Sequence, residues 1–169
     1  MFGNTQERLD KVHAQWISLS WEETAAFIGP NSESFRKVWE KMREAAIQRK
    51  PRVVWSWSWP AFLLFPAWFC YRRMWVLGLP LMLFLLAFSI LTDGESAGGG
   101  IGTAIVLTAM SRQVYLTHAA TKIWQLKNNG EASLDRIAAA GGTSKGGAIV
   151  ATVWALLGIA AVVLSYKGA

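Results

Sequence analysis

The chain has 169 residues, about the length of one domain, and a formal net charge of +6 at pH 7. Its charges are unevenly spread, and none occurs in the runs 53–71, 74–92, 96–111 and 146–166. A membrane-spanning helix needs roughly 20 mostly apolar residues. These runs therefore favour anionic lipid, rather than nucleic acid, as the partner of the positively charged chain. Cys70 is the only cysteine, which excludes an intramolecular disulfide and a cysteine metal cluster.

Residues 1–52 are predicted to form a cytoplasmic arm of three short amphipathic helices. The start of the chain is polar and lacks the apolar stretch of a signal peptide, so we expect none. Ser20 and Glu23 have the spacing of a capping box, which predicts the start of the second helix. Gly29 and Pro30 are expected to end that helix.

The third helix of this arm is expected to begin after a cap at Asn31 or Ser32. Its apolar positions recur three and four residues apart, as they do in the first helix. They are Leu9, Val12, Trp16 and Leu19 in the first helix, and Phe35, Val38, Trp39 and Met42 in the third. Two interpretations stay open: the stripes pack together, or one of them lies on a membrane surface or a partner. Residues 45–52 are expected to form a basic hinge.

Residues 53–73 are predicted to form an interfacial or re-entrant aromatic segment rather than a membrane span. Pro60 and Pro66 interrupt helical hydrogen bonding, and Arg72 and Arg73 would be unfavourable inside the membrane or beyond it. Tryptophan, tyrosine and arginine favour the membrane–water boundary. The candidate residues for lipid and interface anchoring are Trp55, Trp57, Trp59, Trp68, Tyr71, Arg72, Arg73 and Trp75. A four-span topology in which this segment crosses is the alternative.

Three transmembrane helices are predicted, at residues 74–92, 96–116 and 146–166, so the expected fold class is an all-α integral membrane protein. Residues 117–145 are expected to form a cytoplasmic loop with short helices. Small residues recur in rows in the last two spans, and such rows let helix backbones approach closely. The candidate packing residues are Gly98, Gly100, Gly102, Ala104, Gly147, Ala151 and Ala155. Packing within the chain and packing against a partner or a second copy are both open.

The distribution of charge predicts the orientation of the chain. With three spans and the aromatic segment on the N-terminal side, 16 of the 17 lysines and arginines lie on one face. The positive-inside rule then predicts a cytoplasmic N-terminus and a C-terminus outside.

The aromatic segment resembles the signature of an uncharacterised bacterial inner-membrane family, known only as a domain of unknown function. The pattern is carried by Trp59, Ala61-Phe62-Leu63, Pro66, Trp68, Tyr71-Arg72 and Met74. Phe27-Ile-Gly-Pro-Asn31 and Gly141-Gly-Thr-Ser144 look like further parts, within roughly residues 25–165. The sequence departs from the pattern at Ser58, Pro60, Phe65 and Arg73. The resemblance implies a bacterial membrane protein, but it brings no activity and no catalytic residues.

The sequence contains no recognisable catalytic or metal-binding constellation, so we expect a protein that is not an enzyme and holds no cofactor or metal. His13 and His118 are the only histidines, and a metal or haem site needs two or more ligands at set spacing. Asp93 and Glu95 are paired carboxylates on a short turn, which is a poor place for general acid–base chemistry. Cys70 is expected to be a buried filler.

The leading hypothesis is a non-enzymatic accessory or scaffold subunit of a bacterial inner-membrane complex. It would pack against other membrane helices or a second copy and bind anionic lipid headgroups, but not nucleic acid. A small solute transporter or channel is the second hypothesis, and the uncharged spans argue against it. A lipid-modifying enzyme that uses Arg72, Arg73 and His118 is the third; an unaffected His118→Ala variant would remove it.

Overall fold

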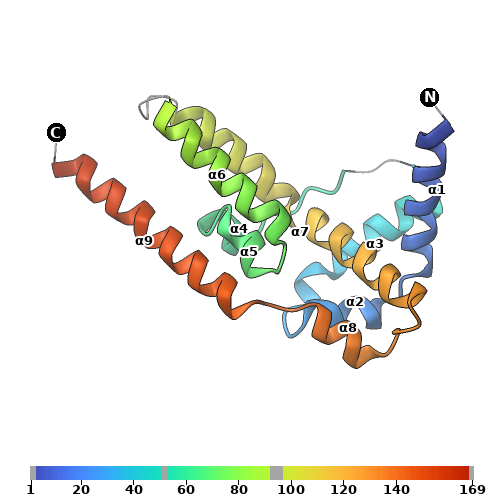
Figure 1. The fold of residues 1–169 in the computed structure, drawn as a ribbon. Coiled ribbons are helices and arrows are strands. Elements are labelled where there is room, and N and C mark those ends of the chain that lie inside the picture. The colour runs from blue at the N-terminus through green and yellow to red at the C-terminus, as the bar shows by residue number, and fades with distance from the viewer. Residues whose placement is uncertain (1–2, 51–52, 92–96, 168–169) are drawn as a thin grey trace. The chain divides into compact units, whose positions relative to one another are not determined.

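The computed structural model describes residues 3–50, 53–91 and 97–167. These residues form helices α1–α9 and, within those ranges, no strand, which confirms the predicted all-α class (Figure 1). They pack into two units. Unit 1 combines Met1–Ser56 with Met110–Gly142, and unit 2 combines Trp57–Ala109 with Thr143–Ala169.

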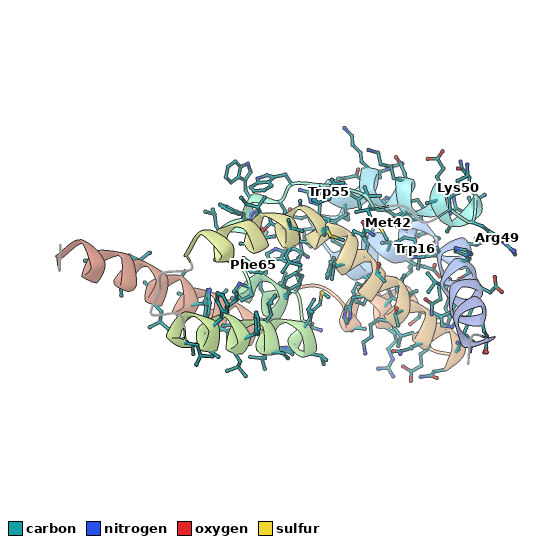
Figure 2. The ribbon with its side chains drawn as sticks, turned by 90° about the horizontal axis from the view of Figure 1, so that it is seen from above. Trp16, Met42, Arg49, Lys50, Trp55 and Phe65 are labelled. Carbon is teal, nitrogen blue, oxygen red and sulfur yellow. The ribbon has the colours of Figure 1, made fainter. Side chains whose placement is uncertain are left out.

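Unit 1 is a bundle of short helices built around its own apolar side chains. It contains α1 (Gly3–Ser18), α2 (Trp21–Ile28), α3 (Glu33–Ile47), α8 (Leu134–Ala140) and the second part of α7 (Ala97–Asn128). Helix α1 packs along α3, and α2 packs along α8. Trp16 and Met42, labelled in Figure 2, lie on α1 and α3. Because Trp16, Phe35 and Trp39 are buried, the stripes pack together, as the first of the two interpretations predicted.

The local signals at the start and end of α2 act as predicted. The Ser20 backbone N–H donates to the Glu23 carboxylate over 2.9 Å, and the Glu23 N–H donates to the Ser20 hydroxyl over 3.1 Å. This is the reciprocal capping box. Gly29 ends the helix with a φ of +87°, a conformation that glycine adopts without strain.

The signals around α3 act differently. Ser32 stands before the helix, but its backbone is helical and its side chain accepts no capping hydrogen bond. The predicted hinge at residues 45–52 is wrong in its first part, because α3 continues to Ile47. Ala45 and Ala46 are buried, so their packing in unit 1 keeps the first residues of the predicted hinge in the helix.

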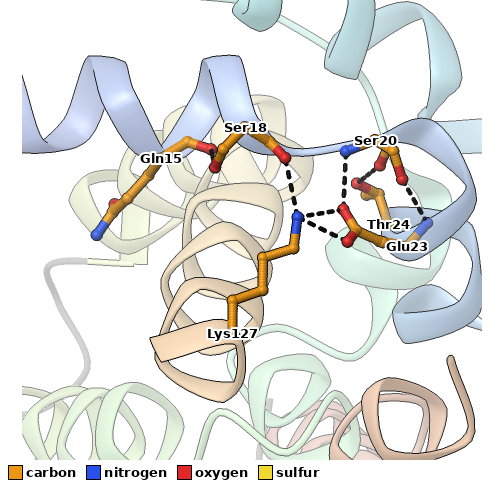
Figure 3. A network of polar contacts seen from close by, with 6 residues as sticks. All are labelled: Gln15, Ser18, Ser20, Glu23, Thr24 and Lys127. Carbon is orange, nitrogen blue, oxygen red and sulfur yellow. Dashed lines mark hydrogen bonds and ion pairs between the residues drawn. The ribbon is translucent and has the colours of Figure 1, made fainter. Parts of the chain in front are cut away.

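The end of α7 is fixed to the turn between α1 and α2 by a network that Figure 3 shows. Lys127 Nζ lies 2.6 Å from Glu23 Oε1 and donates to the Ser18 carbonyl over 2.9 Å. Both charged side chains are largely shielded from solvent. The Glu23 carboxylate of the capping box therefore has a second role, as the partner of a lysine from a distant part of the chain.

One of two five-residue helices lies at the centre of unit 2. The unit contains α4 (Trp59–Leu63), α5 (Ala67–Tyr71), α6 (Trp75–Leu91), α9 (Lys145–Lys167) and the first part of α7. Helix α5 contacts α4, α6 and α9, and its residues Ala67–Cys70 are buried. The run 53–71 is therefore two short helices and a preceding extended segment, not the continuous helix that the four-span alternative requires.

Three membrane spans are not supported by the structure. Within the described ranges, one stretch, Leu134–Ala160, is long and apolar enough to cross a membrane, and α9 provides its apolar part. Helix α6 has 17 residues, about 26 Å at 1.5 Å per residue. The run at 96–116 is not a separate helix, because α7 continues without a break into the polar residues up to Asn128. Apolar runs along the sequence therefore overstated the number of separate spanning helices.

Candidate functional site

The aromatic segment, residues 53–73, places part of its predicted anchoring residues on the surface. In unit 2, the Trp57 and Trp59 rings meet edge to face at 5.5 Å between centroids, and Trp57 lies 5.1 Å from Phe62. Trp59 and the neighbouring Leu63 are largely exposed. Pro60 at the start of α4 fixes this turn, since proline is tolerated in the first turn of a helix. Unit 2 thus carries an exposed aromatic cluster.

The second half of the aromatic segment is packed differently. Trp68 and Arg72 are buried, and the Arg72 guanidinium carbon lies 5.8 Å from the centre of a Trp68 ring, a cation–π arrangement. Tyr71 and Trp75 are half-buried, and Arg73 is exposed with a φ of +60°. Sequence alone did not separate these packed residues from the exposed ones, and their anchoring role stays a prediction.

Helices α6 and α9 leave many large apolar side chains exposed. Val76 of α6 is 92% exposed, and Leu156 of α9 is 60% exposed. The other members of this surface are Leu77, Leu79, Leu83, Phe84, Leu86, Phe88 and Leu91 on α6, and Ile149, Val153, Leu157, Ile159 and Val163 on α9. Neither helix has a charged residue between its ends. Soluble monomers rarely expose contiguous apolar patches of more than a few hundred Å².

One side of α9 is held tightly on α5. A side chain at Gly147 would collide with the Cys70 carbonyl, so only glycine permits this approach. Ala151, one turn further on, is buried. The Trp154 indole N–H donates to the Phe65 carbonyl over 3.0 Å. The predicted small residues at the start of α9 therefore face a helix of their own chain.

The remaining predicted packing residues lie in more open surroundings. A side chain at Gly102 would meet nothing within 4 Å, and Ala104 and Ala155 are half-buried. The surroundings of Gly98 and Gly100 on α7 are outside the described residues. Ala155 also lines an apolar groove of about 550 Å³, together with Leu63, Trp154, Gly158, Ile159 and Val163. Unit 2 therefore keeps small residues both in its interior and on its surface.

The side chains that could act in catalysis or bind a metal do not assemble into such a site in the described part of the chain. No group of three His, Cys, Asp or Glu side chains there could hold a metal ion. Burial and the charge of Lys122 lower the pKa of His118, which packs edge-on against Phe27. Cys70 is buried, as predicted. Asp93 and Glu95 lie outside the described residues.

A basic groove in unit 1 was not predicted. It has a volume of about 420 Å³ and contains Lys37 and Lys41 of α3 together with Arg112 of α7. The spacing of the two lysines places them on one face of α3. Arg112 follows far along the chain, so only the folded unit shows that it joins them.

Among curated proteins and among solved structures, none matches this chain. The model of one family matches residues 2–128. The match ends with the last residue of α7, so α8, α9 and the segment Gly141–Ser144 lie beyond it. It covers the N-terminal arm, the aromatic segment and α6. Because this is well over half of the chain, the protein belongs to the family described as protein of unknown function DUF2628.

Proposed function

We propose that this protein is a non-enzymatic accessory or scaffold subunit of the bacterial inner membrane, embedded through unit 2. The observation that carries the proposal is the uncharged, exposed apolar surface of α6 and α9. Helix α9 has 23 residues, about 35 Å, which exceeds the roughly 30 Å hydrocarbon core of a bilayer. The exposed Trp57–Trp59–Phe62 cluster suits the membrane–water boundary.

The same unit offers surfaces on which other membrane helices could pack. A side chain at Gly102 or Gly158 would meet nothing within 4 Å. Membrane helices associate through small residues that let backbones approach closely. We therefore propose other membrane helices or a second copy of the chain as partners.

Membrane embedding is tested with a matched pair of double variants. Leu156→Arg/Leu157→Arg places two charges on α9, where each costs about 2.5–3.5 kcal/mol in a membrane. Ile17→Arg/Ile47→Arg places the same charges at exposed apolar positions of unit 1; Ile47 is 60% exposed, as Leu156 is. Wild type and the unit 1 variant should stay in the membrane pellet after sodium carbonate extraction, and the α9 variant should not. Wild-type protein in the supernatant would contradict the proposal.

The proposed orientation has a cytoplasmic N-terminus, a crossing α9 and a C-terminus outside. In a Cys70→Ala background, Lys167→Cys should react with a membrane-impermeant maleimide in intact cells, and Gln48→Cys should react only after lysis. The reverse pattern would overturn the orientation. Glu95→Cys adds a further distinction, because it reacts from outside only if α6 and the start of α7 also cross.

The accessory role is tested with tagged protein purified in mild detergent. We expect a second copy or another membrane protein to remain bound in a fixed ratio, and Gly158→Leu to reduce that ratio by filling the open position on α9. A wild-type protein that elutes alone with lipid would argue against an accessory subunit.

A further inference from the structure

We infer that the basic groove of unit 1 binds the phosphodiester headgroup of an anionic phospholipid, with Lys37, Lys41 and Arg112 as the groups that contact the phosphate. The inference deepens the proposed function and rests on it, since it places the groove at the membrane surface.

The groove is formed by three separate segments of unit 1. Ser34, Lys37 and Lys41 line it from one face of α3, because their spacings of three and four residues correspond to successive turns. Trp55 and Ser56 line it from the extended segment that precedes α4. That segment is held by a hydrogen bond of 2.7 Å from the Val54 N–H to the Gln113 side-chain oxygen. Its position against α7 is therefore set by the fold.

Arg112 is held in place before any ligand binds. One of its terminal nitrogens donates to the Ser56 hydroxyl over 3.0 Å, and its guanidinium carbon lies 5.7 Å from the centre of the Phe35 ring. Its side chain is half-buried, and this burial lowers its pKa. A guanidinium has five N–H donors in a rigid fork that matches phosphate geometry. The remaining donors suit an anion that enters the groove.

The charge of the groove is not balanced by the residues that line it. Lys37 and Lys41 are exposed, and within the described ranges neither forms an ion pair. Glu33 is the one carboxylate among the lining residues, and it lies 3.6 Å from Arg36. Three cations thus face a single acid that already has a partner. A ligand phosphate would supply the missing negative charge.

Two features favour a lipid headgroup as the source of that phosphate. Arg112 is the first charged residue of α7, after the uncharged run 97–111. In the proposed membrane placement it therefore lies at headgroup depth, where long basic side chains reach phosphates. Trp55 at the groove is 62% exposed, and an exposed indole suits the same boundary.

The test uses full-length protein in maltoside micelles, so that it does not depend on membrane insertion. Dihexanoyl phosphatidylglycerol is titrated calorimetrically and compared with dihexanoyl phosphatidylcholine and inorganic phosphate. We expect phosphatidylglycerol to bind roughly 10-fold more tightly than phosphatidylcholine, and Lys37→Gln/Lys41→Gln to weaken it roughly 10-fold. Arg112→Gln should weaken it at least as much, and Arg112→Lys less, since a lysine keeps the charge without the fork.

The matched control removes two positive charges from unit 1 outside the basic groove. Arg49→Gln/Lys50→Gln changes exposed residues just beyond α3, labelled away from Trp55 in Figure 2, and should change affinity less than about 2-fold. An equal loss in this control would overturn the site, as would equal binding of the two lipids. Displacement by inorganic phosphate at similar affinity would show a free-phosphate site and overturn the lipid assignment. The carbonate extraction described above can fail or succeed independently of these outcomes.

Discussion

Unit 1 covers many of its large apolar side chains with its own helices, whereas unit 2 buries a smaller set around α5 and leaves many of those on α6 and α9 exposed. Phe27 and Tyr115 are buried in unit 1, while Val76 and Leu156 are exposed in unit 2. The interior of unit 2 combines Trp68 and Phe69 of α5 with a close backbone approach at Gly147 of α9. Removal of apolar surface from water therefore stabilises both units, but the exposed side chains of α6 and α9 in unit 2 do not contribute to it.

The largest loss of stability is expected at Gly147, where α9 lies against the backbone of α5. Gly147→Ala places a methyl group against the Cys70 backbone, which cannot rotate away as a side chain can. We expect a loss of about 3 kcal/mol or more, measured as a lower temperature of unfolding in detergent by tryptophan fluorescence. Gly158→Ala on the same helix is the control, because its added carbon would meet nothing within 4 Å. Equal effects of the two changes would show that backbone contact does not hold unit 2.

The corresponding change in unit 1 removes a large buried side chain. Ile137 of α8 is fully buried, although α8 lies beyond the residues that match the family. Ile137→Ala should cost about 2–3 kcal/mol, at the lower end for such changes because a short helix can shift into the gap. Leu134→Ala on the exposed part of α8 is the control and should cost less than half as much. A negligible effect of Ile137→Ala would mean that α8 is not part of the core of unit 1.

A smaller loss of stability is expected when the ion pair between Glu23 and Lys127 of unit 1 is removed. Glu23→Gln leaves Lys127 largely shielded and without its carboxylate, and should cost about 1–2 kcal/mol at pH 7. Arg136→Gln breaks the exposed pair with Glu131 and should cost less than about 0.5 kcal/mol. If both changes have the same small effect, the network does not stabilise unit 1.

The Glu23 pair also predicts a pH dependence with a definite sign. Partial burial raises the pKa of Glu23, but hydrogen bonds from Lys127 and the Ser20 backbone outweigh it, so the pKa lies below its usual 4.5. A carboxyl group with a lowered pKa contributes stability that is lost as pH falls through the folded-state pKa. The stability difference between wild type and Glu23→Gln should therefore shrink as pH falls below 4.5. A difference that stays constant down to pH 3 would contradict this assignment.

Sequence patterns were most informative where the determining residues are neighbours. The capping box of Ser20 and Glu23 and the stop at Gly29 involve groups within one or two turns, and the structure contains both. The role of Glu23 as the partner of Lys127 was not predictable, because the two residues are 104 positions apart. Arg112 in the basic groove is missed for the same reason. Such pairs depend on how distant helices pack against each other, and the spacing of neighbouring residues does not predict that packing.

The predicted membrane spans show a different limit of sequence patterns. An uncharged run predicts an apolar segment, but it does not say where a helix begins or ends. Residues 53–71 are uncharged, and there the prolines gave the missing signal, since Pro66 separates α4 from α5. No such signal showed that α7 continues through the predicted boundary at residue 116. Burial of Trp68 and Arg72 was also not predictable, because the segment contains the same residue types at its exposed and its buried positions.

The smallest expected effect sharpens the comparison, because the same local strain occurs once in each unit. Arg49 after α3 and Arg73 after α5 have φ angles of +50° and +60°. The Lys50 N–H donates to the Ala45 carbonyl of α3, and the Met74 N–H donates to the Phe69 carbonyl of α5. This is the pattern of a Schellman motif, in which glycine usually occupies the position with positive φ. Arg49→Gly should stabilise unit 1 by about 0.5–1 kcal/mol, since glycine adopts this conformation without strain.

The control for this change is Arg49→Ala, which keeps the strain of a side chain at positive φ and should give no gain. Arg73→Gly makes the same backbone change in unit 2 and should also raise the temperature of unfolding, because glycine adopts a φ of +60° without strain. Thermal unfolding of the three variants in detergent measures the differences. A gain from Arg49→Ala equal to that from Arg49→Gly would mean that the arginine side chain, and not its backbone conformation, destabilises this turn.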